Sequence, residues 1–94
     1  MLKTWPEYFQ EVVNGNKTFD VRKEDDHKFS VGDILFLEEF DPTIGQYTGK
    51  VDGFGVMYCM RGKPYVPDGY VIMGIKSLED IELYVNTKEG EVGE

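Results

Sequence analysis

The chain has 94 residues, of which 40% are hydrophobic and 14% aromatic, and its formal net charge is −8. This length supports one domain, and this apolar content is enough for a packed interior, which excludes an intrinsically disordered protein. Residues 77–94 contain six acids and one base, so they carry −5 and leave −3 on the first 76 residues. We therefore predict one domain over residues 1–76 and an acidic, partly disordered extension over residues 77–94.

Charge, cysteine content and hydropathy narrow the partners and the compartment. An acidic balance argues against a broad, charge-driven grip on nucleic acid, which depends on counterion release by Lys and Arg, but it is compatible with a local basic pocket. The single cysteine, Cys59, lies in the apolar run VMYCM, which indicates a reducing compartment and a buried, inert thiol. No apolar run approaches the ~20 residues that span a bilayer, and no signal-peptide pattern is present. We expect a cytoplasmic monomer without membrane contact.

The first predicted element is a helix over residues 4–14. Thr4 and Glu7 fit a capping box, and Pro6 lies in the first turn, where its missing N–H costs little. Gly15 ends the helix, because glycine readily adopts the left-handed conformation there. The apolar residues that recur at helical spacing predict one stripe along this helix: Trp5, Tyr8, Phe9, Val12 and Val13.

The rest of the chain reads as strands and turns. A strand from Thr18 to Arg22 has Phe19 and Val21 on one face and its polar residues on the other. Further strands are predicted over residues 34–40, 47–60 and 70–76, with a hairpin turn over 41–45 and loops between. Residues 77–85 fit a short helix or a final strand. Together these elements predict an α+β domain whose sheet curls into a small barrel, and Gly53 and Gly55 suggest a bulge or barrel corner.

The segment NGNKTFDVRK carries the pattern Gly15-x-Lys17-x-x-Asp20-x-Arg22. This pattern resembles the G-x-K-x-x-E-x-R signature of ASCH domains, with Asp in place of Glu, and the later Val31-Gly32-Asp33 turn is similar to a second family feature. The segments LKTWPEYFQEVVNG and PDGYVIMGIK resemble one subgroup of this family, small uncharacterised proteins of bacteria and their phages. The resemblance covers about residues 2–76. It implies a PUA-like barrel of about five strands with an N-terminal helix packed against it. It also implies a pocket beside that helix for RNA or a nucleotide.

A branch of the small bacterial relatives hydrolyses the amide of acetylated cytidine with a Lys, a Thr and a Glu. Lys17 matches the lysine of that set, whereas Asp20 stands at the position of the threonine. Thr18 lies two residues earlier in the strand, on the same face, and no residue is assigned to the Glu. Lys17, Thr18 and Asp20 are therefore the candidates for catalysis under this alternative.

Residues alone give the motif two interpretations. The fork of Arg22 can bind a phosphate or carboxylate with two hydrogen bonds, and Lys17 adds a second positive charge. Asp20 can accept hydrogen bonds from a nucleobase, or it can hold Arg22 in place. In the other interpretation, Asp20 and Arg22 form a structural ion pair that closes the barrel against the helix. If the pocket is real, Lys17→Ala should abolish ligand binding and change stability by no more than about 0.5 kcal/mol.

Further candidates for ligand contact lie outside the motif's charged residues. Gly15 belongs to the motif, and Trp5 is either core or a base-stacking residue at the edge of the pocket. Arg61 and Tyr65 in the loop RGKPY either contact phosphate and base or belong to a solvated loop. No metal is predicted, because the acids next to His27 are adjacent rather than spaced as ligands. No cofactor is predicted either.

Three functions follow from these patterns. The leading hypothesis is an RNA- or nucleotide-binding module with a small polar pocket at the motif. The first alternative is an amidohydrolase that acts on an acylated nucleoside such as acetylated cytidine. The second alternative is a phage-derived protein-interaction domain without a small ligand.

Overall fold

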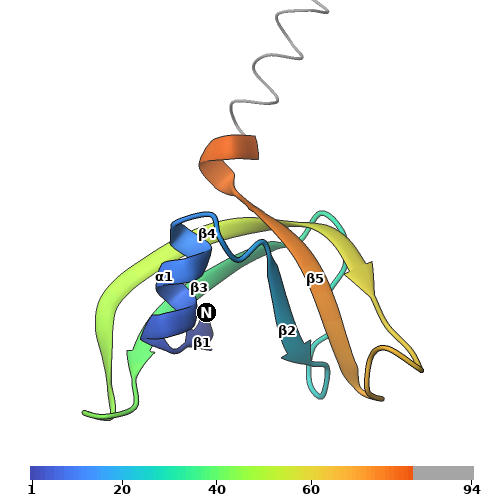
Figure 1. Cartoon of the computed structure of the whole chain (residues 1–94), viewed down its shortest axis with the longest axis horizontal. Helices are drawn as coiled ribbons and strands as arrows, with labels where there is room; N and C mark the ends of the chain where they lie inside the picture. The colour runs from blue at the N-terminus through green and yellow to red at the C-terminus, as the bar shows by residue number, and fades with distance from the viewer. Residues whose placement is uncertain (82–94) are drawn as a thin grey trace, which may run out of the picture.

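A computed structural model describes residues 1–81, which form a curled five-stranded mixed sheet and a short helix (Figure 1). The elements are β1 (Leu2–Thr4), α1 (Pro6–Val13), β2 (Phe19–Lys23), β3 (Ile34–Asp41), β4 (Gln46–Met60) and β5 (Tyr70–Ser77). The strand order is β1-β3-β4-β5-β2, with β1 parallel to β3 and the other neighbours antiparallel. The predicted barrel-like α+β fold is confirmed in the form of a half-barrel.

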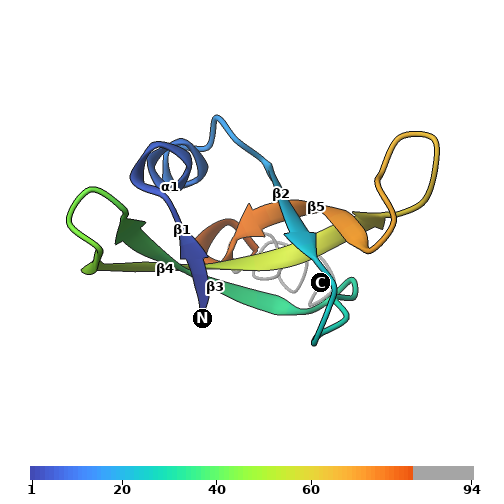
Figure 2. The ribbon, with the colours of Figure 1, turned by 90° about the horizontal axis from the view of Figure 1, so that it is seen from below.

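The curl of the sheet brings its two edges together. β1 and β2 are the edge strands, and they lie on the same side of the half-barrel (Figure 2). Arg22 on β2 donates hydrogen bonds to the backbone oxygen of Lys3 and to the hydroxyl of Thr4 on β1. A single side chain thus bridges the open seam between the first and last strands of the sheet.

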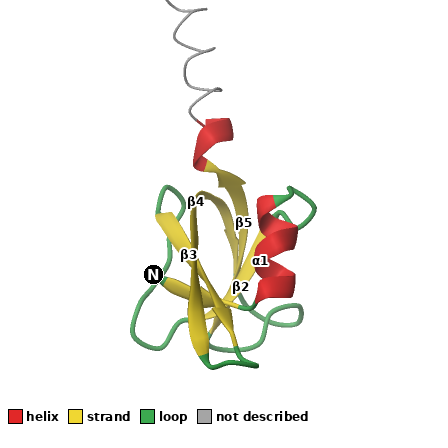
Figure 3. Cartoon of the chain, turned by 90° about the vertical axis from the view of Figure 1, so that its left-hand side faces the viewer, coloured by secondary structure: helices red, strands yellow, loops and turns green. Residues whose placement is uncertain are grey.

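The hydrophobic core lies between the inner face of this sheet and α1 (Figure 3). Alternate residues of β3, β4 and β5 point inward, as a strand period of two requires. Leu37, Val71 and Met73 have no exposed surface. The remaining members of the core cluster are Phe9, Val12, Phe29, Leu35, Phe54, Val56 and Ile75.

The beginning of α1 differs from the prediction. The helix starts at Pro6 with Trp5 as its N-cap, and no side chain caps it. The expected capping box is therefore wrong: Thr4 ends β1, where its hydroxyl donates to the Leu2 carbonyl and accepts from Arg22. β1 itself was not predicted, because three residues are too few to show a strand period.

The apolar stripe of α1 is also narrower than predicted. Only Phe9 and Val12 are buried, whereas Trp5, Tyr8 and Val13 are 48%, 52% and 47% exposed. A helix of eight residues contacts the sheet along one narrow line, so the flanks of the stripe stay outside the core.

The two predicted faces of β2 are present, but the charged face is the inner one. Asp20 is buried at 4% exposure, whereas Phe19 and Val21 are each 45% exposed on the outer face. β2 pairs with β5 in a register that places Asp20 opposite the buried Met73. Cross-strand partners point to the same side of a sheet, so the carboxylate points into the half-barrel.

Residues 78–81, which follow β5, pack on the outer face of the sheet. Residues 78–81 are helical, so the described part of the segment after Ser77 forms the short helix and not a further strand. Residues 82–94 lie outside the described chain. A Cβ at Gly53 would lie 2.7 Å from Leu78 Cδ1, and one at Gly55 would lie 2.5 Å from Ile81 Cδ1. These glycines therefore make room for the helical turn. The irregularities of β4 lie elsewhere, opposite Glu38–Phe40 and at residues 56–58.

Gly55→Ala is expected to displace the turn at residues 78–81 and to lower the free energy of unfolding by about 1 kcal/mol, because the added methyl group overpacks this contact. Amide NMR shifts and hydrogen exchange of residues 78–81 report the displacement. Gly74→Ala is the control, because its Cβ would meet Tyr58 Cβ at an ordinary 3.6 Å. Unchanged shifts at Ile81 in the Gly55 variant would contradict this packing.

Candidate functional site

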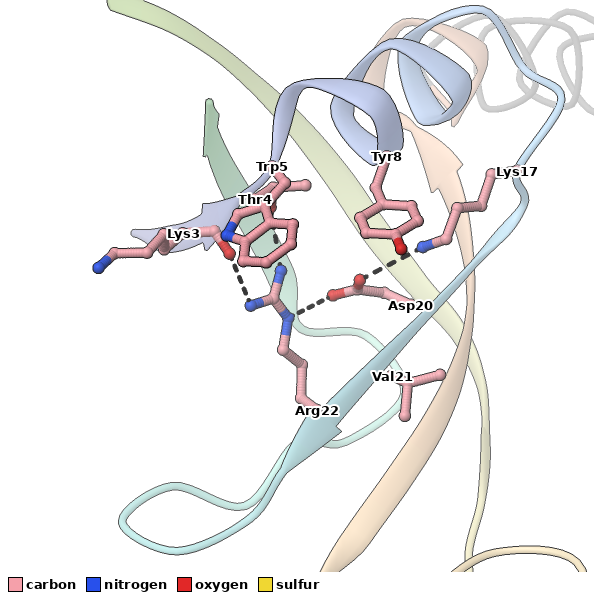
Figure 4. A pocket seen from close by; sticks show the side chains of 8 residues that line it. All are labelled: Lys3, Thr4, Trp5, Tyr8, Lys17, Asp20, Val21 and Arg22. Atoms are coloured by element: carbon pink, nitrogen blue, oxygen red, sulfur yellow. Dashed lines mark hydrogen bonds and ion pairs between the residues drawn. The ribbon is translucent and has the colours of Figure 1, made fainter. Parts of the chain in front are cut away.

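A pocket of about 390 Å³ opens at the seam between the two edge strands (Figure 4). One wall comes from β1 and the start of α1, and the other comes from β2 and the turn before it. The residues that line it are Lys3, Thr4, Trp5, Tyr8, Lys17, Asp20, Val21 and Arg22. Residues distant in sequence meet here only because the sheet curls.

Asp20 lies at the centre of the polar part of the pocket. Its side chain is only 6% exposed, and its Oδ2 accepts a hydrogen bond from Arg22 Nε at 2.7 Å. Its Oδ1 lies 3.6 Å from Lys17 Nζ. Two cations thus offset the cost of burying this carboxylate.

Arg22 joins the two walls of the pocket. Its Nη1 donates to the Lys3 backbone oxygen and its Nη2 to Thr4 Oγ1, both at 3.0 Å, while Nε donates to Asp20. The ion pair between Asp20 and Arg22 that the structural interpretation required is therefore present. The same guanidinium also lines the pocket.

Lys17 is placed by the turn between α1 and β2. Gly15 has φ +82°, a left-handed conformation that favours glycine, and the backbone N–H of Lys17 donates to the Glu11 carbonyl. Lys17 Nζ then donates to the Phe19 carbonyl at 2.8 Å and lies 4.7 Å from the centroid of the Phe19 ring. Its ammonium group therefore has three neighbours within the protein: this carbonyl, this ring and Asp20.

Two aromatic side chains form the rim of the pocket. Trp5 and Tyr8 are three residues apart at the start of α1, which places them on the same side of the helix. The core interpretation of Trp5 is wrong, because this side chain is about half exposed and lines the pocket. The hydroxyl end of Tyr8 points towards Asp20 and Lys17 (Figure 4). The pocket thus combines a polar floor with apolar ring surfaces at its mouth.

The other residues proposed from the sequence lie away from this pocket. Gly15 and Thr18 line a second hollow of about 440 Å³ on the other side of Lys17. Tyr65 is 80% exposed in its loop. Arg61 donates to both oxygens of Glu24, at 2.6 and 2.9 Å, and to the Phe29 carbonyl, so it joins two loops.

Sequence reasoning missed four lining residues: Lys3, Thr4, Tyr8 and Val21. The spacing of Tyr8 from Trp5 was the one available signal, because residues three apart share a helix face. Lys3 and Thr4 gave none, because their contribution depends on β1 lying against the seam.

The pair of Glu24 and Arg61 gives the protein a specific acid sensitivity. Hydrogen bonds from Arg61 and from the Phe29 amide lower the pKa of Glu24 from 4.5 to about 2. A carboxyl group whose pKa is lower in the folded state than in the unfolded state stabilises the fold at pH values above the unfolded-state pKa. This contribution is lost as the pH falls through the folded-state pKa. Part of the stability should thus disappear between about pH 4.5 and pH 2.

Urea unfolding across pH 2–7 measures this effect. Arg61→Gln should flatten the stability profile between pH 4.5 and 2, because Glu24 loses the largest cause of its lowered pKa. Lys63→Gln is the control, because Lys63 forms an exposed ion pair with Asp68 within the loop between β4 and β5. An identical acid profile for the Arg61 variant and the wild type would contradict the assignment.

Within residues 1–81, no group of three or more His, Cys, Asp or Glu side chains is arranged to hold a metal ion. In the same part of the chain, no helix has the length and apolar character needed to cross a membrane.

The fold and the pocket define a small α+β half-barrel protein with a polar, aromatic-rimmed pocket at its seam. Residues 1–75 match the family model described as "Domain of unknown function (DUF3850)", and the chain belongs to this family. No curated protein matches the sequence.

Proposed function

We propose that this protein is a binding module that holds a nucleotide, a nucleoside or the end of an RNA chain in the seam pocket. The observation that carries the proposal is the convergence of Lys17, Asp20 and Arg22 with the rings of Trp5 and Tyr8 around one hollow. Hydrogen-bonding groups at the floor select the polar edge of a base, and exposed rings at the mouth offer a surface on which its flat face stacks.

The resemblance to ASCH domains supports the same proposal. The motif from Gly15 to Arg22 supplies three lining residues of the pocket, and the pocket lies beside the first helix, where the resemblance implies one. We include in the proposal that this half-barrel is a PUA-like fold.

The size and charge of the protein favour a compact ligand. A volume of about 390 Å³ lies at the lower end of small-molecule pockets, which span roughly 300–1,000 Å³. The first 76 residues carry −3, so a long RNA would meet an acidic surface outside the pocket. A nucleoside, a mononucleotide or one terminal RNA residue fits both constraints.

Hydrolysis of an acylated nucleoside gains no comparable support. Thr18, the hydroxyl candidate from the motif, lines the second hollow instead. Thr4 is the one serine or threonine among the residues lining the seam pocket, and its hydroxyl already donates to the Leu2 carbonyl and accepts from Arg22. A nucleophile needs a nearby base that takes its proton, and neither of these partners can act as one.

An amide NMR titration with nucleosides, nucleotides and short single-stranded RNAs tests the proposal. We expect the largest shifts at Lys3–Tyr8 and Lys17–Arg22, with the loop at residues 61–69 unaffected. Acetylated cytidine in the same panel, followed by assay for free acetate, tests the hydrolase alternative. The absence of shifts at millimolar ligand would refute the binding proposal and direct the search to protein partners.

A further inference from the structure

We infer that two copies of this chain form a symmetric dimer through the outer face of β2, β5 and the end of β4. This interface does not depend on the proposed ligand, and it differs from the monomer expected from the sequence. The inference rests on the apolar side chains that share this face and on the area that they expose. It rests also on a ring and a notch that fit each other across a two-fold axis.

The pairing of the strands shows which side chains share this outer face. Gly74 of β5 lies between Phe19 of β2 and Tyr58 of β4. Two residues earlier on β5, Ile72 lies in the same way between a valine and a methionine. Cross-strand partners point to the same side of a sheet, so two apolar rows run across three strands. The side chains of this outer apolar face are Phe19, Val21, Tyr58, Met60, Tyr70 and Ile72.

The exposed area of the outer apolar face is close to what a specific dimer needs. Phe19 and Val21 are each 45% exposed, Tyr58 is 64% exposed, and Met60 and Tyr70 are each 37% exposed. A fully exposed aromatic side chain presents about 200 Å², so these fractions amount to roughly 450 Å² per copy. Two such faces in contact bury roughly 900 Å² of apolar surface, and specific interfaces begin at about 1,200 Å² with their polar rim included.

A protruding ring and an open notch lie next to each other on this face. Tyr58 is its most exposed side chain, and the neighbouring Gly74 has none. A Cβ at Gly74 would meet Tyr58 Cβ at 3.6 Å and the Tyr58 backbone nitrogen at 3.9 Å. Apart from its chain neighbours, no other described residue comes within 4 Å of that position. The surface above Gly74 is therefore open.

This ring and this notch favour a second copy over an unrelated partner. A two-fold axis brings the same patch of both copies together, so each contact occurs twice, once in each direction. The Tyr58 ring of each copy can thus enter the notch at Gly74 of the other. Each copy supplies both halves of the contact.

The charges of the face also permit two copies to meet. The chain carries −8, so two copies repel each other at long range. Within residues 1–81, the outward positions of β2, β5 and residues 57–60 of β4 hold no acid, because Asp20 is turned inward. Contact through this face therefore does not place carboxylates of these strands against each other, and Lys23 and Lys76 lie at its ends.

Sedimentation velocity of the 94-residue chain, from micromolar to near-millimolar concentration, tests the inference. We expect a dimer fraction that rises with concentration. Tyr58→Asp removes the ring and introduces a carboxylate into the interface, so the dimer dissociation constant should rise at least about tenfold. Tyr65→Asp is the matched control, because it makes the same change at an 80% exposed side chain in the loop between β4 and β5. It should leave the dissociation constant unchanged.

Isotope-filtered NMR of a mixture of labelled and unlabelled chains locates the contact directly. We expect intermolecular NOEs between the Tyr58 ring of one copy and the Gly74 Hα protons of the other. The amide spectrum of Tyr58→Asp shows whether this variant folds, since the shifts of α1 and β3 should match those of the wild type. If it does not fold, the NOEs of the wild-type dimer decide the matter.

Three outcomes would overturn the inference. A chain that stays monomeric at the highest concentration leaves the outer apolar face free for a different partner. A dimer that Tyr58→Asp does not weaken uses another surface. A dimer that both Asp variants weaken equally is sensitive to net charge and not to the packing of this ring. None of these outcomes bears on ligand binding in the seam pocket.

Discussion

Arg22→Ala is expected to lower the free energy of unfolding by about 3 kcal/mol, the cost of breaking a largely buried ion pair by removing one partner. The substitution leaves Asp20, with a 6% exposed side chain, without its hydrogen-bond donor. It also removes both bonds to β1, so the seam between the edge strands loses its bridge. Urea unfolding followed by circular dichroism measures the loss.

Two further variants separate the bridge from the charge. Lys23 lies on the same strand and forms an exposed ion pair with Asp25. Lys23→Ala should therefore change the free energy of unfolding by no more than about 0.5 kcal/mol. Arg22→Lys keeps a positive charge near Asp20 but cannot reproduce the planar fork that reaches Lys3 and Thr4. Its stability should fall between those of the wild type and Arg22→Ala. A loss below about 1 kcal/mol in Arg22→Ala would contradict the role of the bridge.

Trp5→Ala is expected to weaken nucleoside binding by about 1–3 kcal/mol, the usual contribution of one aromatic ring stacked on a base. Because Trp5 is 48% exposed, the same substitution should lower stability by no more than about 1 kcal/mol. Binding is measured by NMR titration with cytidine, and stability is measured by urea unfolding of the same sample.

Two control variants make the Trp5 result specific. Trp5→Phe keeps a ring at the rim and should retain most of the affinity. Tyr65→Ala removes an aromatic side chain that is 80% exposed and lies outside the pocket, so it should leave binding unchanged. If Trp5→Ala binds cytidine as tightly as the wild type, the rim does not stack on the ligand.

Together these variants assign different roles to neighbouring residues. Arg22 and Asp20 form the floor of the pocket and also stabilise the fold, because their charges are paired and largely shielded from water. Trp5 and Tyr8 face solvent at the rim, so substitutions at these two positions should change the free energy of unfolding little. The pocket thus combines a floor of paired charges with an exposed aromatic rim.

The sequence by itself determined the local elements. The helix and the four longer strands lie within two residues of their predicted bounds, because the apolar residues of the sequence recur with the helix period of 3.6 and the strand period of 2. It also placed Lys17, Asp20 and Arg22 on one short segment, and the alternation of a strand showed that Asp20 and Arg22 share a face.

Only the tertiary structure decided which face of β2 is buried. Period-2 alternation separates two faces without saying which is buried, and the apolar residues Phe19 and Val21 gave the opposite indication. Asp20 points inward because β2 is the last strand of a curled sheet, whose seam supplies the carboxylate with Arg22 and Lys17. The pocket likewise needs β1, whose Thr4 accepts a hydrogen bond from Arg22 although the two residues are 18 positions apart in the sequence. Such a meeting depends on the curvature of the whole sheet, and no local pattern encodes it.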